Sequence, residues 1–318
     1  MLTSAADPTI VLDGRPAYRP FPATVARLRT LSPHFTRVTF TSAAFDGFGT
    51  AGLDQRVKIL FPIDGVGLSD IGAEDPQPAP ESEWYSRWRA LDDAVRNPFR
   101  TYTVRAIRTV ERELDIDFVT HGDGGPAARW LLAAAPGDSV VIVGPDRYSV
   151  HNRIGLDWHP GAADQVLLVG DETAAPAIAG ILESLGAETT ATALIEVPTA
   201  ADVLPLQAHS GVRVRWIARG EDAVGERLTA AVRGWIAENE IIVARARSPI
   251  AQPLDEVDVD HETLWESPEE SAGDFYAWMA GESAMIKTLR RCLVTEHGID
   301  RRRVAFMGYW RLGRSEMQ

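Results

Sequence analysis

The sequence has almost no cysteine, and this scarcity limits its chemistry. Cys292 is the only cysteine among 318 residues. One cysteine cannot form a disulfide within the chain, and a structural zinc site or an iron–sulfur cluster takes several thiolates. The seven histidines show no ligand spacing such as H-x₃-H. We therefore expect no metal ligated by the protein, so any redox chemistry would depend on a bound organic cofactor.

The chain also lacks long apolar segments and an excess of positive charge. No run of about 18 apolar residues occurs, and the N-terminal stretch MLTSAADPTIVLDGRPAYRP has neither the basic nor the apolar region of a signal peptide. The formal net charge of −13 opposes general binding to nucleic acid or to anionic lipid. These features predict a cytoplasmic protein with no stable membrane insertion and no nucleic-acid partner.

Charge is distributed unevenly along the chain. Residues 252–274 carry nine carboxylates and no lysine or arginine, whereas residues 287–314 carry eight lysines and arginines against two acids. The acidic run is typical of a solvated loop. The basic segment is explained either by cations near the end of a helix or by an anionic ligand.

The hydrophobic pattern divides the chain into two halves. From Tyr18 to about Val143, six β-like runs are separated by turn residues: ATVARLRTL, FTRVTFTS, RVKILFP, RTYTVRAIR, ELDIDFVT and DSVVIVG. Such runs predict an antiparallel barrel or sandwich. After about Gly161, strands alternate with helices, which is typical of βαβ units and a parallel sheet. At roughly 100–200 residues per domain, we predict two domains, residues 18–157 and 158–318.

The stretch FRTYTVR, residues 99–105, is a β-like run in which neither face is apolar. Side chains of alternate parity point to opposite faces of a strand, so Arg100 and Tyr102 share one face. Thr101 and Thr103 share the other face. Core packing alone does not explain this composition, which favours a ligand on at least one face.

A glycine-rich corner follows in DFVTHGDGGPAARW, where Pro126 stands at the expected start of a helix. Such a corner offers backbone N–H groups and a positive helix end to a phosphate, although it is also an ordinary connection. Arg100 can neutralise the same phosphates, and Tyr102 can stack on a planar ring. A flavin dinucleotide has both groups. His121 has no partner for catalysis, so we do not predict a general base there.

The second half has a first βα corner, VLLVGDETAAP, without the G-x-G-x-x-G pattern. Asp171 and Glu172 suit the cap of a helix better than contact with a phosphate. Glu196 ends the next strand, where a carboxylate accepts ribose hydroxyls and favours NADH, or is simply exposed. Nearby Arg219 favours NADPH, so both donors stay open. The small-residue corner at 280–283 lies near the edge where ligands bind.

Five motifs occur in a specific order: RTYTVR, DFVTHGDGGPAARW, GDETAAPAI, WMAGESAMIKTLRR and GYWRLGRSE. With these, the chain from about Tyr18 to Glu316 closely resembles the siderophore-interacting protein family, flavin-dependent ferric-siderophore reductases of the ferredoxin–NADP⁺ reductase superfamily. The resemblance implies a six-stranded antiparallel β-barrel that binds FAD, followed by a parallel-sheet α/β domain for NADH or NADPH. One departure is the linker GPDRYSVHNRIGLDW, where the family often has a glycine-containing turn.

The resemblance also implies the roles of individual residues. Arg100 corresponds to the pyrophosphate-binding arginine, while Tyr102, which stacks on the flavin, and Thr103, beside the flavin N5, are the implied catalytic residues. The other implied FAD-binding residues are Thr101, Val119, Thr120, His121, Gly122, Gly125, Pro126, Ala127 and Trp130. The implied NAD(P)H-binding residues are Asp171, Glu172, Thr173, Gly281 and Glu282, joined by Glu196 and Arg219 from the pattern itself. Tyr309 and Trp310 correspond to C-terminal aromatics near the flavin.

The implied reaction passes hydride from NAD(P)H to FAD and then single electrons to siderophore-bound Fe³⁺, which releases Fe²⁺. Many ferric siderophores are anionic, so we expect basic contacts, and Lys58, Lys287 and Arg301 are the candidates. Two alternatives stay open. One is a general flavin or ferredoxin-type reductase with another acceptor, and the other is a siderophore-binding module with little turnover.

Overall fold

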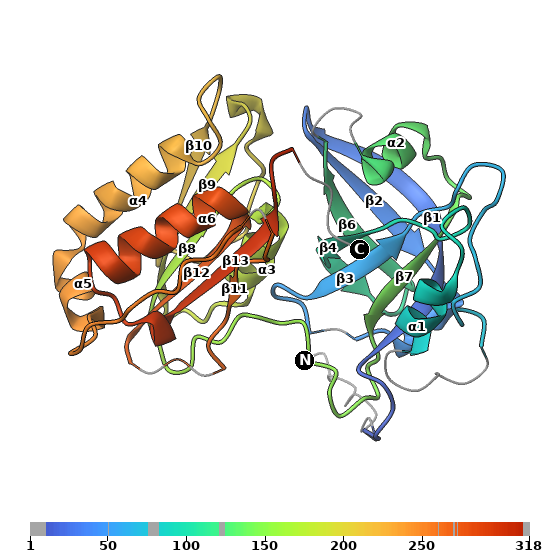
Figure 1. Ribbon diagram of the computed structural model, residues 1–318, viewed down its shortest axis with the longest axis horizontal. Helices are drawn as coiled ribbons and strands as arrows, with labels where there is room; N and C mark the ends of the chain where they lie inside the picture. Colours follow the sequence, from blue (N-terminus) through green and yellow to red (C-terminus); the bar gives the residue numbers. More distant parts are fainter. Residues whose placement is uncertain are drawn as a thin grey trace, which may run out of the picture. The chain divides into compact units, whose positions relative to one another are not determined.

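The computed structural model describes residues 11–49, 51–75, 83–120, 125–259, 261–269, 271 and 273–313. These residues form two compact units (Figure 1). The first unit contains the described parts of 1–28, 38–116 and 123–155, and the second contains those of 29–37, 117–122 and 156–318. Within the described ranges, no helix has both the length and the apolar character that crossing a bilayer requires.

The first unit is built mainly from β-strands. Its elements are β1 (Tyr18–Ser32), β2 (Phe35–Thr41), η1 (Ala43–Gly47), β3 (Arg56–Leu60), α1 (Glu83–Ala90), β4 (Phe99–Thr103), β5 (Ala106–Arg108), β6 (Glu113–Val119), α2 (Pro126–Ala133) and β7 (Ser139–Pro145). The end of β1, the start of β2 and the end of β6 extend into the second unit. All seven strands join one sheet in the order β4-β3-β7-β1-β2-β6-β5. Buried phenylalanines fill part of its interior, with the rings of Phe21 and Phe48 5.0 Å apart.

The sequence predicted six strands here, and the structure has seven. The run RTYTVRAIR is broken at Val104 and Arg105, so that β4 pairs with β3 while β5 pairs with β6. β4 and β5 stand at the two ends of the strand order, yet only two residues separate them in the chain. The sheet must therefore curl until these ends approach each other, which gives a curled antiparallel half-barrel rather than the six-stranded barrel expected.

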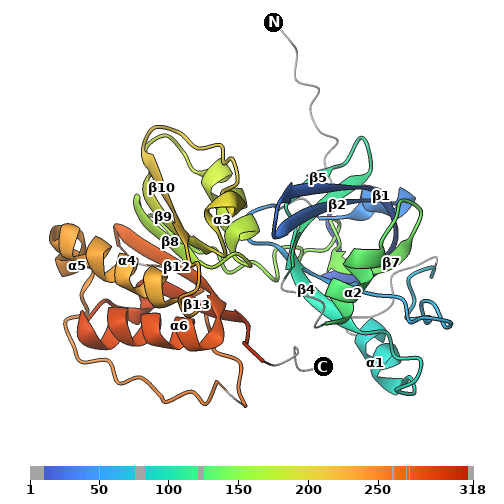
Figure 2. The same ribbon diagram turned by 90° about the horizontal axis from the view of Figure 1, so that it is seen from above.

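The second unit alternates strands and helices, as predicted. Its elements are β8 (Gln165–Gly170), α3 (Ala175–Ser184), β9 (Thr190–Val197), η2 (Ala200–Asp202), β10 (Val212–Ala218), α4 (Glu226–Glu238), α5 (Glu240–Ala246), β11 (Trp265–Glu266), β12 (Phe275–Glu282), α6 (Ser283–Arg290), η3 (Arg291–Glu296), η4 (Arg301–Arg303) and β13 (Val304–Trp310). The sheet order is β10-β9-β8-β12-β13-β11. Figure 2 shows α4 and α6 on one face of this sheet and α3 on the other.

The second sheet is mixed rather than purely parallel. β8, β9, β10, β12 and β13 run parallel, but β11 pairs antiparallel with β13. β11 lies inside the acidic run 252–274, which the sequence predicted to be a solvated loop. Trp265 explains the difference, because its indole Nε1 donates to Asp157 Oδ1 at 3.0 Å and its ring stacks on Tyr309.

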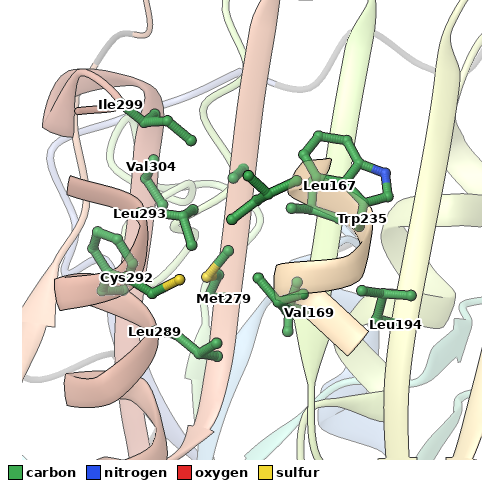
Figure 3. Packing of buried hydrophobic residues seen from close by; sticks show 14 of the residues in the cluster. Leu167, Val169, Leu194, Trp235, Met279, Leu289, Cys292, Leu293, Ile299 and Val304 are labelled. Atoms are coloured by element: carbon green, nitrogen blue, oxygen red, sulfur yellow. The ribbon is translucent and has the colours of Figure 1, made fainter. Parts of the chain in front are cut away.

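The core of the second unit lies between the sheet and the helices α4 and α6. Leu167 and Val169 of β8 contact it from the sheet, and Trp235 of α4 and Leu289 of α6 cover them (Figure 3). Every residue of β12 is buried, because helices cover both faces of the sheet at that strand. Burying each large apolar side chain contributes about 1.5–3 kcal/mol, so this core fixes the sheet edge described below.

Candidate functional site

In the first unit, β4 carries the predicted FAD-binding stretch and stands at the edge of the sheet. The register pairs Arg100 with Ile59, Tyr102 with Val57 and Thr101 with Lys58. Paired residues on neighbouring strands share a face, so Arg100 and Tyr102 lie on one face of the sheet. Thr101 and Thr103 lie on the other face. An edge strand that presents polar groups on both faces is well suited to hold a ligand along it.

Arg100 is a half-buried cation without an acidic partner among the described residues. Its Nη1 donates to the backbone oxygen of Phe99 at 2.6 Å, and no described carboxylate pairs with it. Arg108 of the same unit shows the usual alternative, since it binds Asp115 at 2.7 Å and Glu113 at 3.0 Å. The guanidinium of Arg100 thus keeps its charge for an anion, as a pyrophosphate ligand requires.

The helix α2 begins at the predicted place. Gly125 is its N-cap and supplies no side-chain hydrogen bond, so no described side chain caps the backbone N–H groups of the first turn, which begins with Pro126. Trp130 anchors the helix against Phe61 and Phe40, with ring centroids 5.1 and 6.2 Å away. The N–H groups at the start of α2, without a described side-chain cap, and the guanidinium of Arg100, without a described acidic partner, are donors suited to the phosphates of FAD.

The remaining predicted FAD-binding residues fall around these elements. Val119 ends β6, Thr120 follows it with its backbone N–H bonded to the His34 oxygen at 3.0 Å, and Ala127 lies in the first turn of α2. His121 and Gly122 lie outside the described residues.

In the second unit, the carboxyl ends of β8, β12 and β13 meet at Asp171. Asp171 Oδ1 accepts from Thr173 N at 2.9 Å and Thr173 Oγ1 at 2.6 Å. Asp171 Oδ2 accepts from the backbone N–H of Glu282 at 2.7 Å and from the indole Nε1 of Trp310 at 2.8 Å. One carboxylate thereby fixes the helix corner after β8 and the aromatic residue that ends β13.

Asp171 also has unusual acid–base properties. Its side chain is fully buried, and this burial, with the adjacent Glu172 carboxylate acting in the same direction, raises the pKa of Asp171 to about 7. Hydrogen bonds from Thr173 and Trp310 oppose the increase by stabilising the ionised form. Protonation would place a hydrogen on an oxygen that now accepts two hydrogen bonds, and one donor would then lose its acceptor.

Arg219 lies between two buried carboxylates at the same edge. Its Nη2 contacts Glu172 Oε1 at 2.9 Å, and its Nη1 contacts Glu196 Oε1 at 3.1 Å. Although burial acts to lower it, these two carboxylates raise the pKa of Arg219. Glu196 further accepts from the backbone N–H groups of Gly225 and Leu228. A ribose hydroxyl would have to compete with these protein donors, and a 2′-phosphate would meet an arginine that is already neutralised.

Gly281 and Glu282 have clear structural reasons to be where they are. Gly281 has φ +150°, and a Cβ there would stand 2.6 Å from Asp171 Oδ2 and 2.6 Å from Met285 Cε. Glu282 caps α6 by accepting from the Met285 N–H at 2.9 Å, and it also accepts from Leu312 N at 3.3 Å. Both residues hold the corner between β12 and α6, so the nicotinamide contact remains a proposal for them.

The three basic residues predicted to contact the siderophore lie in different places. Lys58 of β3 donates to Thr101 Oγ1 at 3.1 Å, directly beside β4. Lys287 of α6 donates to the backbone oxygen of Val257 at 2.7 Å, within the acidic run. Arg301 precedes β13, whose seven residues span roughly 20 Å, so it lies at the opposite edge of the sheet from Trp310. Lys287 and Arg301 have different described acidic neighbours, Glu256 at 3.9 Å and Glu266 at 3.7 Å.

One polar cluster in the second unit was not predicted from the sequence. Asp202 is fully buried and accepts from Ser32 Oγ at 2.8 Å, His34 Nδ1 at 2.8 Å and Thr199 Oγ1 at 2.7 Å. Burial acts to raise the pKa of Asp202, but these hydrogen bonds lower it to about 2. The T-x-x-D capping box at 199–202 was the available signal, although it gave no indication of Ser32 and His34.

Both units of the chain match known protein families. Residues 24–149 match the family described as Siderophore-interacting FAD-binding domain, and residues 163–313 match Siderophore-interacting protein. The NADPH-dependent ferric-chelate reductase of Escherichia coli is 28% identical, covering 90% of this chain and 91% of that protein. Ferric vibriobactin reductase ViuB of Vibrio cholerae is 25% identical, covering 91% and 89%. A solved siderophore utilization protein from T. fusca is 28% identical, with TM-score 0.67 and coverage of 95% and 96%.

The chain thus has the two-domain fold of ferredoxin–NADP⁺ reductases, and its first domain makes it a flavoprotein with FAD as its cofactor. More specifically, the chain belongs to the siderophore-interacting protein family. The family resemblance that the five sequence motifs predicted is confirmed.

Proposed function

We propose that this protein is a ferric-siderophore reductase that uses FAD and a reduced nicotinamide nucleotide. The single observation that carries the proposal is Arg100, a half-buried cation without a described acidic partner on the edge strand of a unit that matches an FAD-binding family. The ferric-chelate activities in the names of the two relatives give the substrate class. Electron transfer inside the cytoplasm is part of the proposal.

Bound flavin supplies the conversion that this reaction needs, because it accepts electrons as a pair from a nicotinamide and delivers them singly to Fe³⁺. The protein supplies binding and orientation. Arg100 and the start of α2 would hold the pyrophosphate, Tyr102 would stack on the flavin ring, and Thr103 would offer a hydroxyl to it. One NAD(P)H provides two electrons, so two ferric complexes are reduced for each nicotinamide oxidised.

The nicotinamide nucleotide binds, in this proposal, at the carboxyl edge of the second sheet, around Asp171 and the corner at Gly281. Ligands of α/β sheets commonly bind at this edge. The cluster of Glu172, Glu196 and Arg219 carries one net negative charge when both carboxylates are ionised. It gives no net attraction to a 2′-phosphate, so we propose that NADH is the better donor.

An anionic ferric siderophore would be attracted by a cation beside the flavin strand, and Lys58 is the residue in that place. Arg301, at the opposite edge of the second sheet from the nucleotide corner, is not part of the proposed contact. Lys287 joins it only if its hydrogen bond to Val257 breaks.

A charge-reversal experiment tests the substrate assignment. Lys58→Glu should slow reduction of an anionic ferric siderophore while sparing reduction of a small neutral dye by the same reduced flavin. Arg301→Glu is the matched control and should slow neither. Equal loss with both acceptors would favour a general flavin reductase, and bound FAD that neither NADH nor NADPH reduces would favour a binding module.

A further inference from the structure

The last helix of the second unit changes its winding around the only cysteine. α6 continues into the π-helical turn Arg291–Glu296, in which the N–H of His297 bonds to the backbone oxygen of Cys292 at 3.1 Å. A π-helical turn is rare, and it is often found at functional sites. Here it brings the side chains of residues 292, 296 and 297 to one place.

Three different metal-binding atoms meet in this turn. The Sγ of Cys292, a carboxylate oxygen of Glu296 and a ring nitrogen of His297 all lie within 4.8 Å of one another. Cys292 is fully buried among the apolar residues of the core (Figure 3), whereas Glu296 is exposed and His297 is half-buried. The cluster is therefore closed on the core side by apolar groups and accessible through the other two residues.

The two outer side chains are able to take part. The ring of His297 has no described hydrogen-bond partner. Glu296 Oε2 is held by Arg233 Nη2 of α4 at 2.7 Å, while its Oε1 is 3.7 Å from Arg291 Nε, beyond hydrogen-bonding distance. A ligating carboxylate is commonly oriented in this way, with one oxygen fixed by a neighbour and the other on the metal.

We propose that Cys292, Glu296 and His297 form a binding site for one borderline divalent metal ion, with Zn²⁺ as the best match. Zn²⁺ accepts sulfur, nitrogen and oxygen ligands at about 2.0–2.3 Å, which places the donor atoms roughly 3.5 Å apart. The three donor atoms now lie up to 4.8 Å apart, so they must approach one another by about 1 Å. Rotation of the Glu296 and His297 side chains provides this movement. Binding displaces the thiol proton to solvent, and no electron is transferred.

The donor set selects among metals. Thiolate and imidazole together favour Zn²⁺, Co²⁺ and Fe²⁺ over Mg²⁺ and Ca²⁺, which prefer oxygen ligands. A divalent ion with one thiolate and one carboxylate forms a neutral group, so Arg233 and Arg291 do not repel it strongly. Three protein ligands leave a fourth position open to water. The spacing of the histidines gave no indication of this set, because only one of them takes part.

The test uses the FAD-loaded protein after removal of metals with a chelator. Co²⁺ is the probe, because a thiolate bound to Co²⁺ gives a charge-transfer band in difference spectra, in which the flavin bands cancel. With a single cysteine in the chain, such a band identifies Cys292. The proposal predicts the band at one Co²⁺ per protein and its loss in Cys292→Ser. Since losing even an outer-shell partner of a ligand weakens metal affinity about 10- to 100-fold, His297→Ala should weaken Co²⁺ binding by at least roughly that factor.

Controls separate binding from folding. His297 is on the surface side of the site, so His297→Ala should keep the melting temperature of the metal-free protein even if Cys292→Ser lowers it. His261→Ala removes an exposed histidine elsewhere and should leave Co²⁺ affinity unchanged. Stoichiometric Zn²⁺ should erase the band, whereas anaerobic Fe²⁺ should need an excess. Absence of the band, or equal Co²⁺ affinity in His297→Ala and wild type, would overturn the proposal.

Discussion

Replacing Arg100 tests the proposed contact with the FAD pyrophosphate. Arg100→Gln removes a positive charge that faces no described carboxylate, so the loss is of an interaction with ligand rather than of an internal ion pair. A hydrogen bond to a charged group contributes about 1.5–3 kcal/mol. At 1.4 kcal/mol per factor of ten, FAD affinity should fall about 10- to 150-fold. Arg100→Lys keeps the charge but loses the planar guanidinium, so its affinity for FAD should lie between those of the wild type and Arg100→Gln.

The assay is titration of the FAD-free protein with FAD, followed by flavin fluorescence. Arg129→Gln is the matched control, because Arg129 is an exposed arginine on α2 and changes the net charge equally. The free energy of unfolding of the FAD-free protein should change by less than about 0.5 kcal/mol in Arg100→Gln. Unchanged FAD affinity in Arg100→Gln, or the same loss in Arg129→Gln, would refute the assignment of Arg100 to the pyrophosphate.

Three further predictions concern the second unit. Gly281→Ala should lower the free energy of unfolding, measured with denaturant, by about 1–3 kcal/mol, because the added Cβ would clash with Asp171. Gly234→Ala in α4 is the control: its Cβ has open space and should raise the free energy of unfolding by about 0.5–1 kcal/mol. The folded-state pKa of Asp171 is raised from 3.8 to about 7. As pH rises between these values, the free energy of unfolding of the wild type should therefore fall relative to that of Asp171→Asn; the same pH dependence in both proteins would disprove this. Glu172→Gln should remove one of the two carboxylates paired with Arg219 and bring the cluster from one net negative charge to zero. It should raise kcat/KM for NADPH relative to NADH about tenfold, as one charge-assisted hydrogen bond of ~1.5 kcal/mol gives; an unchanged ratio would contradict the role of this cluster in donor choice.

Much of the fold was predictable because it depends on local patterns. The alternation of apolar residues located the strands of the first unit, and the change to strand and helix after Gly161 predicted the second. The break between β4 and β5 was not visible, because Val104 and Arg105 fit a continuous strand. β11 was missed for a different reason: Trp265 lies in an acidic run, and only its contacts with Asp157 and Tyr309 hold it against the sheet.

The local geometry of the candidate site was predictable where one motif forms one strand. FRTYTVR predicted a strand on which Arg100 and Tyr102 share a face, but not that this strand stands at the edge of its sheet. The backbone partners of Glu196 were not predictable, since Gly225 and Leu228 lie 29 and 32 residues further along the chain. Arg301 shows the same limit. Residues that are close in the basic stretch of the sequence are separated in space, because α6 runs along the sheet in one direction and β13 runs back in the other.

The visible spectrum of the purified protein tests most directly whether it is an FAD-dependent ferric-siderophore reductase. The protein is incubated with FAD and desalted, and its spectrum is then followed without oxygen as NADH or NADPH is added. The account predicts that flavin bands remain, that they bleach on addition of the nicotinamide nucleotide, and that they return when a ferric siderophore is added. Flavin bands that bleach but do not return with the ferric siderophore would contradict the proposed substrate. Flavin that NADH and NADPH both leave oxidised would contradict the proposed reductase.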